Sequence, residues 1–563
     1  MSKIKLAHLA GPNATITNTP PLVTSNKARA RHGLPPLTDA DGRPSRYDVL
    51  RTQRLAAPTT VYVERHSAHP LEADADDLYA GPDGWLDAQG TFSRTPVPGG
   101  KPVYEIELRP EDGLYPLPYM ARQADGSAWE GVATAPGAPR EQTRQSYFPD
   151  GTRLFEEVDR LGVDGNGRGN LVSDRASVDY YRLAPSAGYA NGLDAAARPD
   201  RGEGDIPPER AGHDYFAYSP LHLSMSPSRA ILARITNQTQ RILSSGDYDG
   251  AIWTQGSPRI EETMYWFHLA LDVTAPISGN AAHRYHGLVS SDGQKNIADS
   301  VEYLASRVWA DEHGRNRCGA VMCQDQRIYA AREVAKVDAR PGGYAATGGH
   351  GGILGAVGGG TGTVLHYLPA TKHTWRSEVN VSRLPASVVG LAGEGFSGRP
   401  VRVRVKGDAG EILESAIPKV SVVKDVGYHE DDFDGDPMQE VDVLALIARK
   451  LATAPLSGFV LEGLNPYGWA ASASRNRVLA AAAHLGFPVV TVGRGNTEGF
   501  SVGGGPVIRG SNLTATKAVV LLRLCIMKLG MLPPAVDPWR PTTAEVAATM
   551  RAIEAYQAIF DTH

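Results

Sequence analysis

Cysteine is scarce in this chain of 563 residues, which contains only Cys318, Cys323 and Cys525. Three thiols cannot build a disulfide framework, and they cannot supply the four ligands of a closed Cys-only zinc site. The spacing between Cys318 and Cys323 also matches neither a redox motif nor a zinc motif. We therefore expect all three cysteines to be buried thiols.

The sequence also lacks a long apolar run and a strong excess of one charge. No uninterrupted apolar stretch is long enough to cross a bilayer, and the run near the N-terminus is too short for a signal peptide. The formal net charge of -5 at pH 7 gives no reason to expect nucleic acid or an anionic membrane surface as a partner. We expect a soluble cytoplasmic protein that binds neither.

Glycine and proline, in contrast, are abundant, with 61 and 40 residues, which predicts many turns and long loops. The length exceeds that of a single ordinary core, so we expect two or more domains. Strands alternate with helices between about 230 and 336 and again from 418, which predicts an α/β fold with mainly parallel sheets. The segment 38–212 is irregular, but it is too long for an unstructured connection and should have a partial fold of its own.

Residues 249–266 have the pattern of a buried strand, a glycine turn and a helix. The apolar residues 251–253 suit the strand, and Gly256 permits a tight turn at its carboxyl end. Ser257 and Pro258 then suit the cap and first turn of the helix. Because ligands of open α/β folds bind beyond the carboxyl ends of strands, Ser257 is either a helix cap or a reactive group. The local pattern by itself favours the cap.

Two further segments resemble ligand-binding loops but depart from the known patterns. The glycine-rich residues 348–362 lack the terminal Gly-Lys-Ser/Thr of a phosphate-binding loop. The acidic residues 431–436 lack the later bidentate Glu of a calcium loop. The chain also has no His-Glu-x-x-His or comparable metal spacing. We expect turns at the first segment and a solvated loop at the start of a helix at the second, and neither a metal nor a cofactor.

Acyl transfer by a hydroxyl nucleophile needs a group that takes its proton and donors for the oxyanion. The chain offers Thr15 in a loop after the first expected strand, Ser257 at a strand end, and Lys336 after another strand. A buried Lys with a lowered pKa can act as a base. Spacing alone does not show that these three residues meet.

Five short segments resemble, in the same order, motifs of the bacterial type I/II L-asparaginase family of amidohydrolases. The strand–turn–helix segment is similar to a block with Gly-Thr-Asp and Glu-Glu-Thr, and the others resemble Ser-Ala-Asp-Gly, Gly-Arg-Asp-Val-x-Lys, Lys-His-Thr and Leu-x-x-x-Lys-Ala. The segments are residues 249–266, 290–297, 331–336, 372–374 and 513–518. Each match is short, and the shared order is what makes the resemblance specific.

The resemblance implies a set of site residues. Thr15 matches the first catalytic Thr, in a mobile loop that closes over the substrate, while Ser257 replaces the second Thr and Lys336 matches the catalytic Lys. Ser226 falls where the family has a substrate-binding Ser, and Gly256 keeps the family's Gly. The implied reaction is attack of the Thr15 hydroxyl on an amide carbonyl, release of amine or ammonia, and hydrolysis of the acyl-enzyme.

The chain departs from the family at several of these positions. Asn13-Ala-Thr15 replaces Gly-Gly-Thr, and Tyr47 is a distant candidate for a Tyr that normally follows closely. Pro258 replaces the Asp that binds the ammonium group of the amino acid, and it offers neither a carboxylate nor an N–H. We expect a substrate other than free asparagine, such as a cyclic amide, an imide or a substituted amide.

The resemblance also implies a domain organisation and an assembly. We expect an N-terminal α/β domain over 1–385 with the insertion 38–212, an inserted β segment or linker over 386–417, and a C-terminal α/β domain over 418–563. A homodimer or homotetramer is expected, in which Asn465 and Glu498 lie where the family completes the neighbouring subunit's site.

Three alternatives stay open. The protein could be an L-asparaginase or glutaminase proper, or a catalytically silent ligand-binding protein on the same fold, as Pro258 and the altered Thr15 loop suggest. A metal-dependent hydrolase using His and Asp residues is the third, although no motif supports it.

Overall fold

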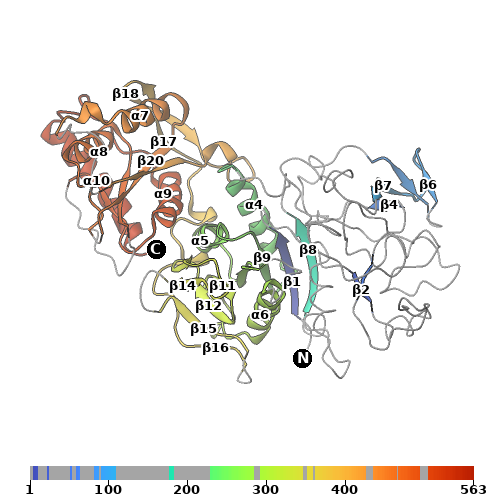
Figure 1. Ribbon diagram of the computed structural model, residues 1–563. Coiled ribbons are helices and arrows are strands. Elements are labelled where there is room, and N and C mark those ends of the chain that lie inside the picture. The colour runs from blue at the N-terminus through green and yellow to red at the C-terminus, as the bar shows by residue number, and fades with distance from the viewer. Residues whose placement is uncertain are drawn as a thin grey trace.

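The computed structural model describes residues 4–10, 22–24, 51–53, 59–63, 82–87, 91–108, 176–182, 228–284, 292–346, 351–358, 362–426, 435–465, 467–494 and 505–563. Within them, strands and helices alternate around an 8-stranded sheet and a 4-stranded parallel sheet (Figure 1). The expected α/β class is therefore confirmed.

The 8-stranded sheet is mixed and has the order β16-β15-β12-β11-β10-β9-β1-β8. Strands β8, β1, β9, β10 and β11 run parallel, whereas β12, β15 and β16 extend the sheet in antiparallel fashion. The strands are β1 Ile4–Ala10, β8 Ala176–Arg182, β9 Gly250–Thr254, β10 Ile277–Asn280, β11 Ala320–Gln324, β12 Arg327–Ala330, β15 Ile353–Ala356 and β16 Val364–Leu365. The expectation of parallel strands is met at the β8–β11 end of the sheet.

Part of the predicted insertion belongs to this sheet. Strand β8 comes from the segment 38–212 and pairs along its whole length with β1, from Ile4 opposite Ala176 to Ala10 opposite Arg182. The same segment contains most of the remaining described strands before residue 228, which pair among themselves. These strands are β2 Leu22–Thr24, β3 Arg51–Gln53, β4 Thr59–Val63, β5 Gly84–Leu86, β6 Phe92–Ser93 and β7 Lys101–Leu108. The segment is thus tied into the main sheet by an edge strand.

Three helices alternate along the chain with the parallel strands of this sheet. Helix α4, Ile231–Ser244, precedes β9, α5, Ile260–Ala270, connects β9 to β10, and α6, Gly293–Ser306, connects β10 to β11. Residues 250–253 of β9 are all buried, as the apolar pattern predicted. The ring of Trp253 on β9 meets the edge of Phe267 on α5 at 4.7 Å between centroids. This packing holds the last turn of α5 against β9.

The second sheet is wholly parallel and contains β19 Lys419–Lys424, β20 Ser457–Gly463, β21 Val489–Gly493 and β22 Ile508–Arg509. Its helices are α7 Val441–Thr453, α8 Ala473–Leu485, α9 Ala515–Leu529 and α10 Thr543–Phe560. The hairpin of β17, Ser387–Glu394, and β18, Ser397–Arg404, is joined to this region, because Leu391 N donates to Pro455 O at 2.8 Å and Met531 N to Val389 O at 2.8 Å. Short 3-10 helices lie at Thr374–Arg376, Val381–Arg383, Glu414–Ala416 and Pro437–Gln439.

The two sheets share a continuous hydrophobic core. Buried side chains extend without a break from β1 and β9 through α5 and α9 to α10. Helix α5 packs directly on α9, and the two lie side by side in Figure 1. All three cysteines are buried free thiols, as predicted, and burial raises the pKa of each. None of the helices in the described ranges is long and apolar enough to span a membrane.

Candidate active site

The candidate site lies at the carboxyl ends of β1 and β9. The two strands are parallel neighbours whose register places Ala10 opposite Thr254, so the segments that follow them leave the same edge of the sheet. The Thr254 hydroxyl donates to Asn280 Oδ1 at 2.7 Å and lies 2.8 Å from His8 Nε2. These contacts tie the ends of β1, β9 and β10 together immediately before the Ser257 turn.

Ser257 does not cap the helix, and that prediction is wrong. Helix α5 begins at Ile260, its N-cap residue is Arg259, and no side chain caps it. The Ser257 hydroxyl instead accepts a hydrogen bond of 2.8 Å from Tyr344 Oη. The physical reason is that Pro258 and Arg259 lie in a turn between Ser257 and the helix, so Ser257 is too far from the first helical residue to cap it. The hydroxyl is therefore held by a tertiary contact.

Tyr344 is a site residue that the sequence did not indicate. It lies on β14, Tyr344–Ala346, and is almost fully buried. Burial raises its pKa, so the phenol stays protonated at neutral pH and acts as a hydrogen-bond donor to Ser257. Its main-chain oxygen accepts a bond of 2.9 Å from Tyr329 Oη, and its ring meets the His283 ring at 5.0 Å. No local pattern marks Tyr344, because its role depends on a partner 87 positions away.

Lys336 ends strand β13, Val334–Lys336, and lies opposite Tyr344 in the antiparallel β13–β14 pair. Side chains of residues directly opposite each other project from the same face of such a pair. The Lys336 N–H also donates to Glu261 Oε2, in the first turn of α5, at 2.7 Å. Two contacts therefore bring the Lys336 strand to the Ser257 turn, one through Tyr344 and one through Glu261.

Lys517, on α9, supports the chain that leads to Lys336. Its buried ammonium group donates to the main-chain oxygens of Ala331, Arg332 and Val334, the last at 2.6 Å. Burial lowers the pKa of Lys517 to about 8, and the charge of Glu261 opposes that shift. The resemblance of residues 513–518 to a family motif pointed to this Lys, but only the structure shows that it anchors β13.

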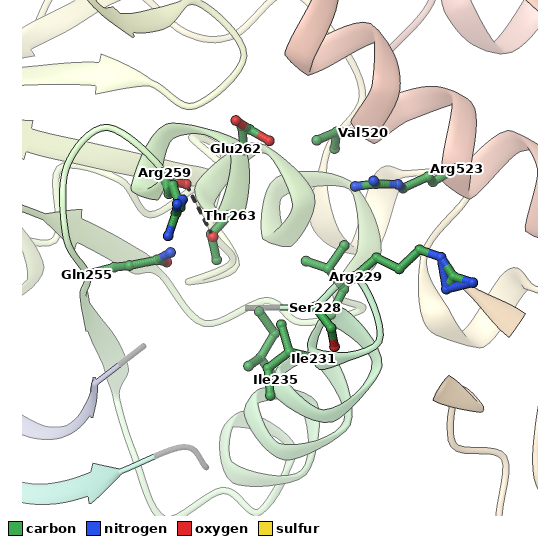
Figure 2. Close-up of a pocket in the computed structure, with 11 residues that line it drawn as sticks. Ser228, Arg229, Ile231, Ile235, Gln255, Arg259, Glu262, Thr263, Val520 and Arg523 are labelled. Atoms are coloured by element: carbon green, nitrogen blue, oxygen red, sulfur yellow. Dashed lines mark hydrogen bonds between the residues drawn. The ribbon is translucent and has the colours of Figure 1, made fainter. Parts of the chain in front are cut away.

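A pocket of about 220 Å³ lies on the α4 side of the same turn, between α4, α5 and α9 (Figure 2). Gln255 and Arg259, which flank Ser257 two residues away on either side, both line it. Its other lining residues are Ser228, Arg229, Ile231, Leu232, Ile235, Glu262, Thr263, Val520 and Arg523. The pocket thus adjoins both the Ser257 turn and the segment that follows Ser226.

The remaining predicted residues are placed as follows. Thr15, Ser226, Tyr47 and Glu498 lie outside the described residues. Gly256 and Pro258 lie in the turn between β9 and α5, on either side of Ser257. Asn465 is exposed in the turn after β20. Of the three expected catalytic residues, the structure thus brings together the segments of two, Ser257 and Lys336.

One cluster has the composition of a metal site. His283, Asp292 and Asp325 offer ligand atoms that lie within 4.8 Å of one another. Asp292, however, already accepts hydrogen bonds from the main-chain N–H groups of residues 283 and 284 and from the amides of Asn296 and Gln324. A carboxylate with this many donors has little capacity left for a cation. We interpret the cluster as a clamp that fixes the start of α6.

Comparison with known proteins agrees with these motifs. Residues 208–348 match the family model of the asparaginase N-terminal domain. The chain is 31% identical to an L-asparaginase of Bacillus licheniformis over 108 residues, which is 19% of this chain and 32% of the relative. It is 27% identical to L-asparaginase 2 of Bacillus subtilis over 108 residues, which is 19% of this chain and 27% of the relative.

A crystal structure named "Probable Cytoplasmic L-asparaginase" from Campylobacter jejuni is 18% identical, with a TM-score of 0.45, and the match covers 69% of this chain and 93% of that one. The aligned parts span about a third of the length of the Bacillus relatives. Over residues 208–348 the chain is therefore similar to the asparaginase N-terminal domain, and it shares this likeness with curated L-asparaginases.

Proposed function

We propose that this protein is an amidohydrolase that cleaves a carbon–nitrogen amide bond through an acyl-enzyme on Thr15, without a metal ion. The observation that carries the proposal is the hydrogen bond from Tyr344 to Ser257 beyond the carboxyl end of β9. Lys336 lies opposite Tyr344 on the paired strand β13. The Ser257 hydroxyl, the Tyr344 phenol and the strand that carries Lys336 thereby lie together where an α/β sheet places its ligands. The domain match to the asparaginases supports the same reaction class.

The position of β1 supports Thr15 as the nucleophile. Ala10, five residues before Thr15, lies opposite Thr254, which is three residues before Ser257. The carboxyl ends of the two strands therefore lie side by side, which supports a nucleophile on the chain that follows β1. In the proposed reaction the Thr15 hydroxyl attacks the amide carbonyl, main-chain N–H groups bind the oxyanion, and the amine leaves with a proton.

Ser257 and Lys336 would carry the protons of this reaction. Because Tyr344 donates to the Ser257 oxygen, the hydroxyl hydrogen of Ser257 is left to point towards another acceptor. As Ser257 receives the proton of Thr15 it can pass its own proton to the amine of Lys336, while Tyr344 stabilises the partial negative charge that develops on the Ser257 oxygen. Water then hydrolyses the acyl-enzyme by the same route in reverse.

The proposed substrate is a cyclic amide, an imide or a substituted amide. Pro258 follows Ser257 directly and stands where the resembling family has an Asp. The carboxylate that would bind the ammonium group of an amino acid is therefore missing at this position. A free amino acid would then lose a charge-assisted hydrogen bond, worth about 1.5–3 kcal/mol. The preferred substrate should therefore lack a free ammonium group.

The test is release of ammonia or amine from a panel of linear and cyclic amides. Thr15→Ala and Lys336→Ala should each reduce turnover by at least a factor of about 100, whereas Lys424→Ala, at an exposed lysine of β19, should not change it. Full activity in both site variants would refute the assigned site. Tight binding of an amide without turnover would instead favour the silent ligand-binding alternative.

A further inference from the structure

The pocket beside the Ser257 turn is rich in guanidinium groups. Arg229, Arg259 and Arg523 line it together with one carboxylate, that of Glu262. Three positive groups against one negative group leave the lining with an excess of positive charge. The three arginines come from three separate places in the fold, the start of α4, the start of α5 and the middle of α9. This lining is termed the arginine pocket below.

Arg523 has a buried donor atom that a bound ligand could satisfy. It extends from α9 towards the first turn of α5 (Figure 2). Its Nε atom is buried and, within the described part of the chain, has no hydrogen-bond partner. Burial lowers the pKa of Arg523 to about 10, although the charge of Glu262 opposes this shift. A buried donor without a partner destabilises the fold, and a bound anion would supply the missing acceptor.

The arginine pocket lies close enough to Ser257 to hold one end of a substrate. Arg259 is two residues from Ser257, so the two Cα atoms are separated by at most roughly 7 Å. The volume of about 220 Å³ is small for a complete ligand, since ligand pockets usually measure about 300–1,000 Å³. It suits one charged end of a molecule whose reacting bond lies at the Ser257 turn.

We propose that the arginine pocket binds the carboxylate of the substrate, and that the substrate is an anionic amide without a free ammonium group. This inference rests on the proposed amidohydrolase function and narrows its substrate class. Guanidinium groups bind carboxylates through paired N–H donors and repel ammonium groups. The replacement at Pro258 acts in the same direction, because it withholds a carboxylate from an ammonium group. Both features select against a zwitterion.

Three related compounds separate the possible charge states of the substrate. Succinamate is an anionic amide, L-asparagine is the same molecule with an added ammonium group, and succinamide is neutral. Succinamate should have a kcat/KM at least about ten times that of either of the other two. Succinate, which has no amide to cleave, should bind at least about ten times more tightly than succinamide in calorimetric titration of the Thr15→Ala variant, which does not turn the amide over.

Matched variants assign this binding to the pocket. Arg523→Gln and Arg259→Gln should each weaken succinate binding by at least about tenfold, whereas Arg551→Gln, at an exposed arginine of α10, should leave it unchanged. Arg523→Lys keeps the charge and should retain part of the affinity. Equal affinity of the Thr15→Ala variant for succinate and succinamide would overturn the inference, as would unchanged succinate binding in both pocket variants.

The two proposals fail in different ways. If succinate binds as expected but no amide is hydrolysed, the anion-binding role of the arginine pocket is supported and the amidohydrolase function is refuted. If succinamate and succinamide are hydrolysed with equal kcat/KM, the amidohydrolase function is supported and the preference for an anionic substrate is refuted.

Discussion

Single hydrogen bonds define the candidate site at the residue scale. The bond from Tyr344 to Ser257 joins two segments that are distant in sequence, and the bond from Lys336 N–H to Glu261 joins the same two segments again. Because Tyr344 is buried and its pKa is raised, it acts as a neutral donor throughout the physiological pH range. The orientation of the Ser257 hydroxyl therefore depends on one phenol.

The variant Tyr344→Phe tests this dependence. It should lower the free energy of unfolding by about 0.5–1.5 kcal/mol and reduce kcat by about tenfold, with little change in KM, because Tyr344 acts through Ser257. Tyr329→Phe is the matched control, since it removes the bond from Tyr329 Oη to Tyr344 O but leaves the phenol of Tyr344 in place. Urea unfolding and steady-state kinetics measure both effects. Equal kcat values in the two variants would contradict the role of Tyr344.

At the scale of elements, the β13–β14 hairpin is held between two helices. Glu261 on α5 accepts the N–H of Lys336, and Lys517 on α9 donates to three carbonyls before and within β13. Helix α5 packs on the 8-stranded sheet and α9 on the 4-stranded sheet. The position of the hairpin that carries Lys336 and Tyr344 therefore depends on how the two helices pack together.

Replacing Lys517 should show how strongly α9 holds this hairpin. Lys517→Met leaves three buried carbonyl groups without their donor, and we expect a loss of about 2–4 kcal/mol in the free energy of unfolding. Lys528→Met is a suitable control on the same helix, because Lys528 is only partly buried and donates to a single carbonyl, that of Arg383. Its loss should stay below about 1 kcal/mol in the same urea experiment. Similar losses in both variants would argue against the anchoring role.

A second buried lysine predicts a pH dependence of stability. Lys450, on α7, donates to Lys419 O at 2.6 Å, and burial lowers its pKa to about 7. The unfolded chain binds the proton up to about pH 10.5, so between about pH 7 and 10.5 it binds more protons than the folded chain at this site. The cost of the buried charge is therefore complete below about pH 7 and decreases as the pH rises above it.

Lys450→Met lacks this proton equilibrium. The free energy of unfolding of the wild type, measured relative to the variant in urea at pH 6, 7.5 and 9, should increase with pH by at most about 1.4 kcal/mol per unit. The increase should be small below pH 7. A difference that is constant from pH 6 to 9 would show that Lys450 keeps its proton in the folded state.

At the scale of the whole molecule, two sheets share one core, and aromatic side chains remain on the surface beyond β20. Tyr467 and Trp469 stack at 5.0 Å between ring centroids and are 44% and 46% exposed. They follow Asn465, which the resemblance places at the neighbouring subunit's site. Exposed aromatic side chains are enriched in subunit interfaces.

The expected homodimer or homotetramer can be tested at this surface. Sedimentation velocity should show an oligomer, and Trp469→Ala should weaken its association by at least about tenfold, as expected for an aromatic residue at an interface. Trp375→Ala, at a tryptophan whose Nε1 donates to Asn316 O within the chain, is the control and should leave the association unchanged. A wild-type protein that sediments only as a monomer would refute the expected assembly.

The sequence by itself determined the α/β class and the buried β9 strand, because both depend on local apolar patterns and on the alternation of strands with helices. It also identified Ser257 and Lys336 as candidates through ordered motifs. The local pattern taken alone favoured a helix cap at Ser257, which the structure contradicts, because a hydroxyl after a strand has the same local pattern in either role.

Only the tertiary structure decided the partner of Ser257, the anchoring of β13 by Lys517, and the meeting of three arginines in one pocket. Each of these contacts joins residues that are far apart in the chain, and no periodicity or spacing encodes such a pair. They form because the shared core packs α5 against α9, which brings the β9–α5 turn, the β13–β14 hairpin and Arg523 to the same edge of the sheet.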